Sequence, residues 1–429
     1  MGGLGGDSGH LNHLYEDYGL TFGRLKKLLN LVEHNKITLY EKVDGQNLSL
    51  THNPKLHKTF AARNKSDLKA GGVDTLAMEK RYAADDKSKV KLAFTSAMKA
   101  FYKSVMELSY YQRFQIFDSS LGGIPFINLE VMSIINPNVI KYSGNYLVMH
   151  SSSRYKKGTA QGANCTETFQ TIIKSMANSV VPTPTGLWMI KGPTEINLSG
   201  TSNTTKMNQA IQDLDNFMID NHLEDDDTIG DYIEGQIVLR HLENIELSSE
   251  IENEFINRML DVPGTRPTPS IVKNIDWSWK EQLLLLAKSR KSVVRKIILP
   301  LEMIINDFGI GLLENSHSSF VDDGPDQALE LQEKTAEAIN LVRKENNPAV
   351  IEKLDMHLKK LGKDLGSSIT STVEGVVFAD PDDDDISYKI TGAFAPMNQI
   401  LGFVNPGFAK SRVKELPKSS SPTLPIFVA

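Results

Sequence analysis

The sequence predicts an α+β protein in which antiparallel sheets are flanked by helices. Short apolar strings rich in β-prone residues occur at 40–50, 126–132 and 373–378, and such strings are typical of strands. Two longer segments, 87–118 and 278–305, repeat their apolar residues with the period of a helix. Strands and helices thus occupy separate stretches of the chain, as in the α+β class.

The first elements are a helix and a set of strands. Thr21 is a preferred N-cap residue, and it precedes an apolar stripe over 25–32 that predicts a short helix. This helix leads to the strands of 40–50. A turn at Asn53, which is followed by proline, predicts that 59–62 returns as the next strand.

The middle of the chain predicts more sheet. An amphipathic helix over 87–118 is followed by strands at 126–132 and 146–149. Residues 185–245 still alternate like sheet, and within them 232–238 is interpreted as a core strand.

The chain then changes character. The helix over 278–305 is predicted to stop at Pro300, a second helix covers 327–345, and a third covers 347–362. Because strands resume after these helices, we expect a bundle of about 100 residues inserted into the sheet-containing core. The predicted units are a first part of the core at 1–265, a helical insert at 266–365, a second part of the core at 366–410 and a flexible tail at 411–429.

Composition limits the class of protein. The chain has 429 residues, of which 40% are apolar and 23% charged, as in ordinary globular proteins. It contains no apolar run of membrane-spanning length and no secretory signal, so we expect a cytoplasmic monomer that makes no membrane contact. Cys165 is its only cysteine, which excludes an internal disulfide and a thiolate zinc site. With a net charge of -6, nucleic acid would have to bind a local basic patch.

One hexapeptide carries a reactive group. Residues 42–47 read Lys-Val-Asp-Gly-Gln-Asn and follow an apolar strand, which would hold Lys42 in place. A lysine becomes nucleophilic when burial or nearby positive charge makes its ammonium easier to deprotonate. The alternative is a β-hairpin with an Asp-Gly turn and a solvated Lys42.

Isolated charges in apolar strings mark further candidates. Glu130 interrupts the strand 126–132, and a charge there is costly unless it has a partner or a function. Glu374 begins the string Glu-Gly-Val-Val-Phe, and Lys389 lies fifteen residues later on a second strand. The aspartates at 382–385 between these strands predict a solvated hairpin tip rather than a metal site.

These residues, in this order, resemble the motifs of the covalent nucleotidyltransferases, which comprise ATP-dependent DNA and RNA ligases and GTP-dependent capping enzymes. Asn47, which ends the hexapeptide, makes the resemblance closest to the RNA ligase 2 group. The resemblance implies a nucleotidyltransferase core with Lys42 as the catalytic nucleophile. It also implies that the nucleotide is contacted by Glu41, Lys42, Asn47, Arg63, Glu130, Tyr146, Glu374 and Lys389.

Individual roles follow from the same resemblance. Arg63 would contact the ribose and the substrate phosphate, Glu130 the sugar, and Tyr146 would stack on the base. Glu374 would hold a divalent metal and Lys389 would neutralise the α-phosphate. Motif V of the family usually has a second basic residue, and this chain has only Lys389 between Ser387 and Thr391.

The activity that the resemblance implies is ligation of polynucleotides with ATP and Mg²⁺ or Mn²⁺ as cofactors. A lysyl-AMP intermediate would pass AMP to a 5′-phosphate, and a 3′-hydroxyl would then seal the joint in RNA, DNA or both. Only 40 residues follow Lys389, so no C-terminal OB domain is expected, which favours an RNA ligase. The alternatives are a DNA ligase, a GTP-dependent capping-type guanylyltransferase and a non-catalytic nucleic-acid-binding protein.

A basic patch lies in the predicted helix 278–305. Lys288, Lys291 and Arg295 would share one helical face. Such a stripe can be a solvated face, or it can bind the phosphates of a polynucleotide. The sequence gives both interpretations equal weight.

Overall fold

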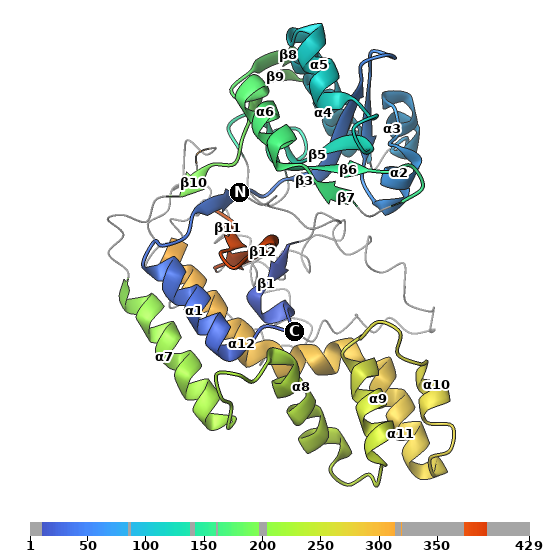
Figure 1. Cartoon of the computed structure of the whole chain (residues 1–429), viewed down its shortest axis with the longest axis vertical. Coiled ribbons are helices and arrows are strands. Elements are labelled where there is room, and N and C mark those ends of the chain that lie inside the picture. Colours follow the sequence, from blue (N-terminus) through green and yellow to red (C-terminus); the bar gives the residue numbers. More distant parts are fainter. Residues whose placement is uncertain are drawn as a thin grey trace, which may run out of the picture.

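The computed structural model has an α+β fold, as predicted, with two sheets and helices on their outer faces (Figure 1). It describes residues 11–84, 87–137, 142–159, 162–196, 204–313, 319 and 373–392. The predicted helices at 327–345 and 347–362 and the predicted tail at 411–429 lie outside the described residues. Both sheets are mixed, because each contains one parallel pair of strands, whereas the sequence predicted antiparallel sheets.

The first sheet joins segments from both ends of the described chain. Its strands follow the order β1-β12-β11-β2-β10. Their bounds are Asn12–His13 for β1, Asp383–Thr391 for β12, Gly375–Asp380 for β11, Leu39–Lys42 for β2 and Glu195–Ile196 for β10. β11 pairs with β12 as a hairpin and with β2 on its other side, both antiparallel, while β1 runs parallel to β12.

The second sheet is built from the middle of the chain in the order β4-β3-β5-β6-β9-β8, with β7 added to β6. The bounds are Lys58–Ala62 for β4, Gln46–Asn53 for β3, Ile124–Met132 for β5, Asn145–Tyr155 for β6, Gly162–Asn164 for β7, Val180–Thr183 for β8 and Gly186–Lys191 for β9. The predicted strands at 46–50, 59–62, 126–132 and 146–149 all belong to this sheet.

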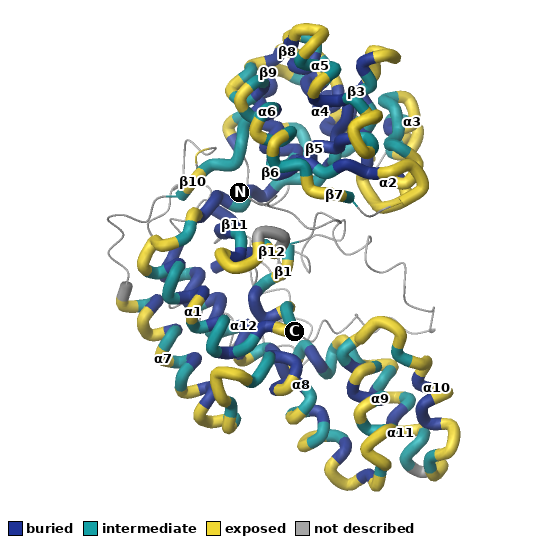
Figure 2. The backbone as a smooth tube through the Cα atoms, viewed as in Figure 1, coloured by how far each residue is buried: buried dark blue, intermediate teal, exposed yellow. Residues whose placement is uncertain are grey.

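Helices cover one face of the second sheet (Figure 2). They are α3 (Thr75–Arg81), α4 (Ser88–Glu107), α5 (Tyr110–Phe117) and α6 (Thr166–Met176). By contrast, α2 (Lys65–Ala70) packs its Leu68 with Ala62 and Phe126, which lie on the other face. The predicted single helix over 87–118 is two helices. The first has Leu108 as its C-cap, and Ser109 caps the second, because its side chain and that of Gln112 form a reciprocal capping box.

The other helices share one apolar core with the first sheet. This core buries Leu39 of β2, Val376 of β11 and Ile390 of β12 against helices from both halves of the chain. The helices are η1 (Leu14–Glu16), α1 (Phe22–Glu33), α7 (Thr204–Asp220), α8 (Ile229–Ile237), the π-helix Val238–Leu242, α9 (Ser249–Met259), α10 (Thr268–Ile271), α11 (Trp277–Lys288) and α12 (Arg290–Leu313).

Two expectations about this region are wrong. The sheet-like alternation expected over 185–245 holds only as far as β10, because α7 and α8 follow it. The supposed core strand at 232–238 is helical, and Ile229, Tyr232 and Ile233 are buried with the spacing of a helix. Helices therefore begin well before the predicted boundary at 265.

The helix that contains Pro300 also differs from the prediction. The sequence pattern predicted that the helix would stop at Pro300, but α12 continues to Leu313. A proline inside a helix costs about 3 kcal/mol. Ile297, Leu301 and Ile305 flank this position and are fully or almost fully buried in the core, so their packing outweighs that cost.

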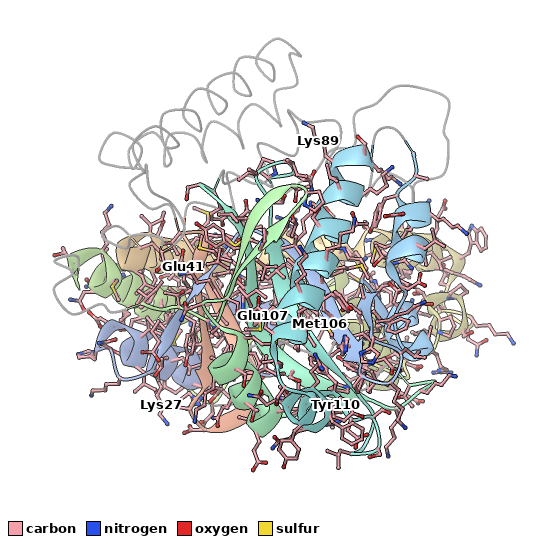
Figure 3. The ribbon with its side chains drawn as sticks, turned by 90° about the horizontal axis from the view of Figure 1, so that it is seen from above. Lys27, Glu41, Lys89, Met106, Glu107 and Tyr110 are labelled. Atoms are coloured by element: carbon pink, nitrogen blue, oxygen red, sulfur yellow. The ribbon has the colours of Figure 1, made fainter. Side chains whose placement is uncertain are left out.

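The tip of the β11–β12 hairpin is tied to α1. Arg24 pairs with both Asp380 and Asp382, and Lys27 bonds Asp382 at 3.0 Å. Lys27 projects from α1 at the rim of the molecule (Figure 3). Asp380 is buried at the end of β11, whereas Asp382 and Asp383 are exposed, as predicted for a solvated hairpin tip.

We expect Arg24→Met to lower the free energy of unfolding by about 3 kcal/mol, because it leaves the buried Asp380 without its cation. Urea denaturation measures this change. Lys27→Ala is the matched control, and it should cost less than about 1 kcal/mol because its ion pair is exposed. Equal losses for the two variants would contradict the interpretation.

Candidate active site

Lys42 is the last residue of β2, as the sequence predicted. The Asp-Gly dipeptide that follows is not a hairpin turn, because β2 and β3 belong to different sheets. The segment Val43–Gly45 instead carries the chain from the first sheet to the second. Gly45 is required there, since a Cβ would lie 2.9 Å from Oε2 of Glu130. The alternative of a solvated lysine on a simple hairpin is therefore excluded.

Glu374 meets Lys42 through strand pairing. Gly375 of β11 is the register partner of Lys42, which brings Glu374 beside it. The Lys42 Nζ to Glu374 Oε1 distance is 2.5 Å, and both side chains are largely buried. Burial alone would lower the pKa of Lys42, but the charges of Glu374 and Glu130 outweigh it and raise that pKa. The ligand-free site therefore holds Lys42 as an ammonium ion.

Glu130 reaches the same place from the second sheet. It lies on β5 opposite Asn47 of β3. Burial raises the pKa of Glu130 to about 8, although Lys42 opposes the shift, and it raises the pKa of Glu374 to about 7. Oε2 of Glu130 is buried and has no hydrogen-bond partner among the described residues. The two sheets thus place two carboxyl groups around one lysine.

Asn47 and Arg63 lie beside Glu130. The Asn47 amide donates to Oδ1 of Asn128 at 2.6 Å, which fixes its orientation on β3. The Arg63 guanidinium donates to the Asn47 carbonyl and lies 5.2 Å from the ring centre of Phe94. The charge of Arg63 also opposes the rise in the pKa of Glu130, so Arg63 acts electrostatically on the site. The two predicted residues are therefore brought together with Glu130.

Lys389 lies on the same face of the first sheet as Lys42, which we call the site face. Only 6% of Lys389 is exposed, and it forms no ion pair with a described residue. Burial, together with the charge of Lys42, lowers the pKa of Lys389, against the opposing effect of Glu16. On either side of it on β12, Ser387 Oγ and Thr391 Oγ1 are buried without a hydrogen-bond partner among the described residues. A buried cation flanked by two such hydroxyls is suited to an anionic ligand.

Two further predicted contact residues are buried. Tyr146 is the register partner of Met132, so it lies on the same face of the second sheet as Glu130; it is 5% exposed and packs with Val43, Met132 and Val148. The side chain of Glu41 points to the helix-covered face of the first sheet, where it accepts a hydrogen bond from the Ser319 backbone at 3.1 Å. Glu41 is 5% exposed, and Figure 3 labels it.

The sequence analysis missed His150. This residue is the extra one at a bulge in β6, because Asn128 and Leu129 pair with the residues on either side of it. Burial and the charge of Lys42 lower the pKa of His150 to about 4, so the imidazole is neutral near pH 7. No local signal marks a bulge in an apolar strand, but a lone histidine at the end of the string 146–149 could have been noticed.

The basic patch is split between two helices. α11 ends at Lys288 and α12 begins at Arg290, so the expected single helical face is wrong. Lys288 and Lys291 are exposed, whereas Arg295 is half-buried and close enough to Tyr15 to affect its pKa. Arg290 bonds Asp261 at 2.6 Å and is thus already paired.

The donor set bears on the expected metal. Within the described part of the chain, no group of three or more histidine, cysteine or acidic side chains could hold a metal ion. Magnesium is commonly held by one or two carboxylates together with water and substrate phosphates. Glu374 and the unsatisfied Glu130 fit that second arrangement, in which the ion arrives with a nucleotide.

We expect the raised pKa of Glu130 to make stability depend on pH. Between pH 4.5, the ordinary pKa of a glutamate, and about pH 8, Glu130 is neutral in the folded protein but ionised in the unfolded chain. Folding therefore takes up a proton in this pH range. The stabilisation is therefore complete below pH 4.5 and is lost as the pH rises to about 8. Glu130→Gln should flatten this fall, by a few kcal/mol at most, as measured by denaturation from pH 5 to 8. The matched control, Glu250→Gln, alters an exposed glutamate and should leave the slope unchanged.

Comparison of the chain with protein-family models, with curated proteins and with solved structures finds no match. None of the described helices combines the length and apolar character that a membrane crossing requires.

Proposed function

We propose that this chain is an ATP-dependent polynucleotide ligase of the RNA-ligase type, built on a nucleotidyltransferase core. The observation that carries the proposal is the 2.5 Å contact between Lys42 and Glu374, two residues far apart in the chain. The sequence motifs alone predict both residues. Glu130 and Lys389 complete a buried group of two acids and two lysines.

The first step transfers AMP to the protein. Lys42 loses its proton, its Nζ forms a bond with the α-phosphorus of ATP, and the bond from that phosphorus to pyrophosphate breaks. Lys389 lies on the same face and offsets the charge of the phosphates. A magnesium ion held at Glu374 would add positive charge there and would weaken the ion pair that keeps the pKa of Lys42 high.

The next steps use the stored lysyl-AMP. AMP passes to the 5′-phosphate of a strand, and a 3′-hydroxyl displaces it to form the phosphodiester. Incubation with α-labelled ATP and magnesium should give an acid-labile covalent label. A panel of RNA and DNA strands at the 3′-hydroxyl and 5′-phosphate sides then identifies the substrate. Absence of the label in the intact protein would refute the proposal.

Two other activities are separated by the same assay. A capping-type enzyme would be labelled by GTP rather than ATP. A binding protein without chemistry would not be labelled. The buried Lys389, which has no ion-pair partner among the described residues, argues against it, since a buried cation without a ligand only costs stability.

We expect the exposed part of the basic patch to bind the backbone of the substrate. Lys288→Glu combined with Lys291→Glu should weaken binding of RNA at low salt by about tenfold and reduce the salt dependence of binding. Labelling by ATP should not change. The control, Lys89→Glu with Lys99→Glu, alters exposed lysines of α4 instead; Figure 3 labels Lys89. Unchanged RNA affinity in the Lys288→Glu, Lys291→Glu variant would show that the patch is a solvated face and does not bind RNA.

A further inference from the structure

One row of side chains crosses the site face of the first sheet. Neighbouring strands place Glu195, Tyr40, Val377, Lys389 and His13 in register, from β10 at one edge to β1 at the other. Register partners on neighbouring strands present their side chains on the same face. Figure 1 shows β1 beside β12, on the side away from β2. His13 is therefore the next side chain beyond Lys389.

The charges in this row are unequal at its two ends. Glu195, on the β10 side of Lys42, is an acid. Lys389 and His13 lie on the other side, about 5 and 10 Å beyond β11 at the usual spacing of strands. Lys389 is the cation of this row, and the exposed Glu16 acts on it from the β1 side. An anion on the site face would thus be attracted toward Lys389 on β12 and repelled from Glu195 on β10.

The geometry of the proposed reaction selects the same direction. In phosphoryl transfer the attacking and leaving atoms lie roughly in line through the phosphorus. When Lys42 attacks the α-phosphorus, pyrophosphate must leave on the far side of that phosphorus. On the site face, pyrophosphate that leaves Lys42 toward β12 and β1 moves toward the positive charge of Lys389. The unsatisfied hydroxyls of Ser387 and Thr391 lie along this path.

The position of His13 is fixed by its neighbours. Its ring stacks on that of Tyr15 with 4.8 Å between centres, and Tyr15 bonds Glu302 of α12 at 3.4 Å. The backbone N–H of His13 donates to Oε2 of Glu16 at 2.8 Å. Glu16 is exposed, and it is the acid nearest to His13 in sequence. A stacked, half-buried imidazole needs little reordering to meet a ligand.

We propose that β1 provides a pyrophosphate subsite, in which an imidazole N–H of His13 donates a hydrogen bond to the phosphates beyond Lys389. His13 binds the β- and γ-phosphates of ATP and the pyrophosphate product, while Lys389 lies nearer the α-phosphate. This inference rests on the proposed function, because it assigns the leaving group of the same reaction.

The test separates the two halves of the catalytic cycle. Pyrophosphate reverses the first step, since it attacks the phosphorus of lysyl-AMP, breaks the P–N bond and regenerates ATP. We expect His13→Ala to raise the pyrophosphate concentration for half-maximal discharge about tenfold, as loss of one charge-assisted hydrogen bond predicts. Sealing of a strand supplied with AMP already on its 5′-phosphate involves no pyrophosphate and should proceed at the rate of the unaltered protein.

Two further variants keep the result interpretable. His13→Lys should restore discharge to within about threefold, because its ammonium group restores a hydrogen-bond donor at the same place. His34→Ala alters an exposed histidine at the end of α1 and should have no effect. An unchanged pyrophosphate dependence in His13→Ala, or an equal loss in discharge and sealing, would overturn the subsite. Failure of the unaltered protein to form lysyl-AMP would refute the proposed function instead, and calorimetry with magnesium pyrophosphate would then decide the subsite alone.

Discussion

Lys42→Ala should abolish covalent labelling by α-labelled ATP, with a loss of about 10⁴-fold or more in the rate of lysyl-AMP formation. No other described lysine replaces it, because Lys389 lies two strands away on β12. Lys42→Arg should be equally inactive, since a guanidinium keeps its proton and cannot act as the nucleophile. The measurement is the acid-labile label retained on a denaturing gel.

The fold should survive this change. Without Lys42, the carboxyls of Glu130 and Glu374 can remain protonated near pH 7, because burial raises the pKa of both. Lys27→Ala, which removes an exposed lysine, serves as the control and should be labelled normally. Labelling of Lys42→Ala at the normal rate would show that another residue is the nucleophile.

Lys389→Met should separate activity from stability. We expect the rate of lysyl-AMP formation to fall about 10² to 10³-fold, as when one group that stabilises developing charge is removed. The free energy of unfolding should rise by about 1 to 3 kcal/mol, because a buried cation without a partner is replaced by an apolar chain of similar length.

The stability gain should depend on pH. Because the pKa of Lys389 is lowered in the folded protein, the cost of its charge is present at neutral and acidic pH and disappears as the pH rises toward 10.5. Denaturation at pH 6 and pH 9 measures the difference. A loss of stability in Lys389→Met at pH 6 would mean that its ammonium has a favourable partner in the ligand-free protein.

Local patterns predicted the strands of both sheets well. The strands that carry Lys42, Glu130 and Lys389 were found because an apolar string interrupted by one charge is a strong signal. The same reasoning failed at 232–238, where a short apolar string fits a helix equally well and only packing against α1 and α7 decides. Element type is ambiguous for such strings.

Contacts that depend on register could not be predicted. The pairing of Gly375 with Lys42 and of His13 with Lys389 is set by the order of strands in the first sheet. β1 has only two residues and leaves no periodic signal. The position of His150 depends on a bulge, which likewise has no signature in an apolar string.

The order of strands in the first sheet has a consequence for biosynthesis. β2 is made early and β11 and β12 are made late, so Lys42 has neither its carboxylate neighbour nor its flanking strand until most of the chain has left the ribosome. Contacts between such distant segments form slowly and leave a strand edge exposed meanwhile. A nascent chain interrupted before residue 373 would contain Lys42 and Glu130 but would lack Glu374 and Lys389, so the buried group around Lys42 could not assemble.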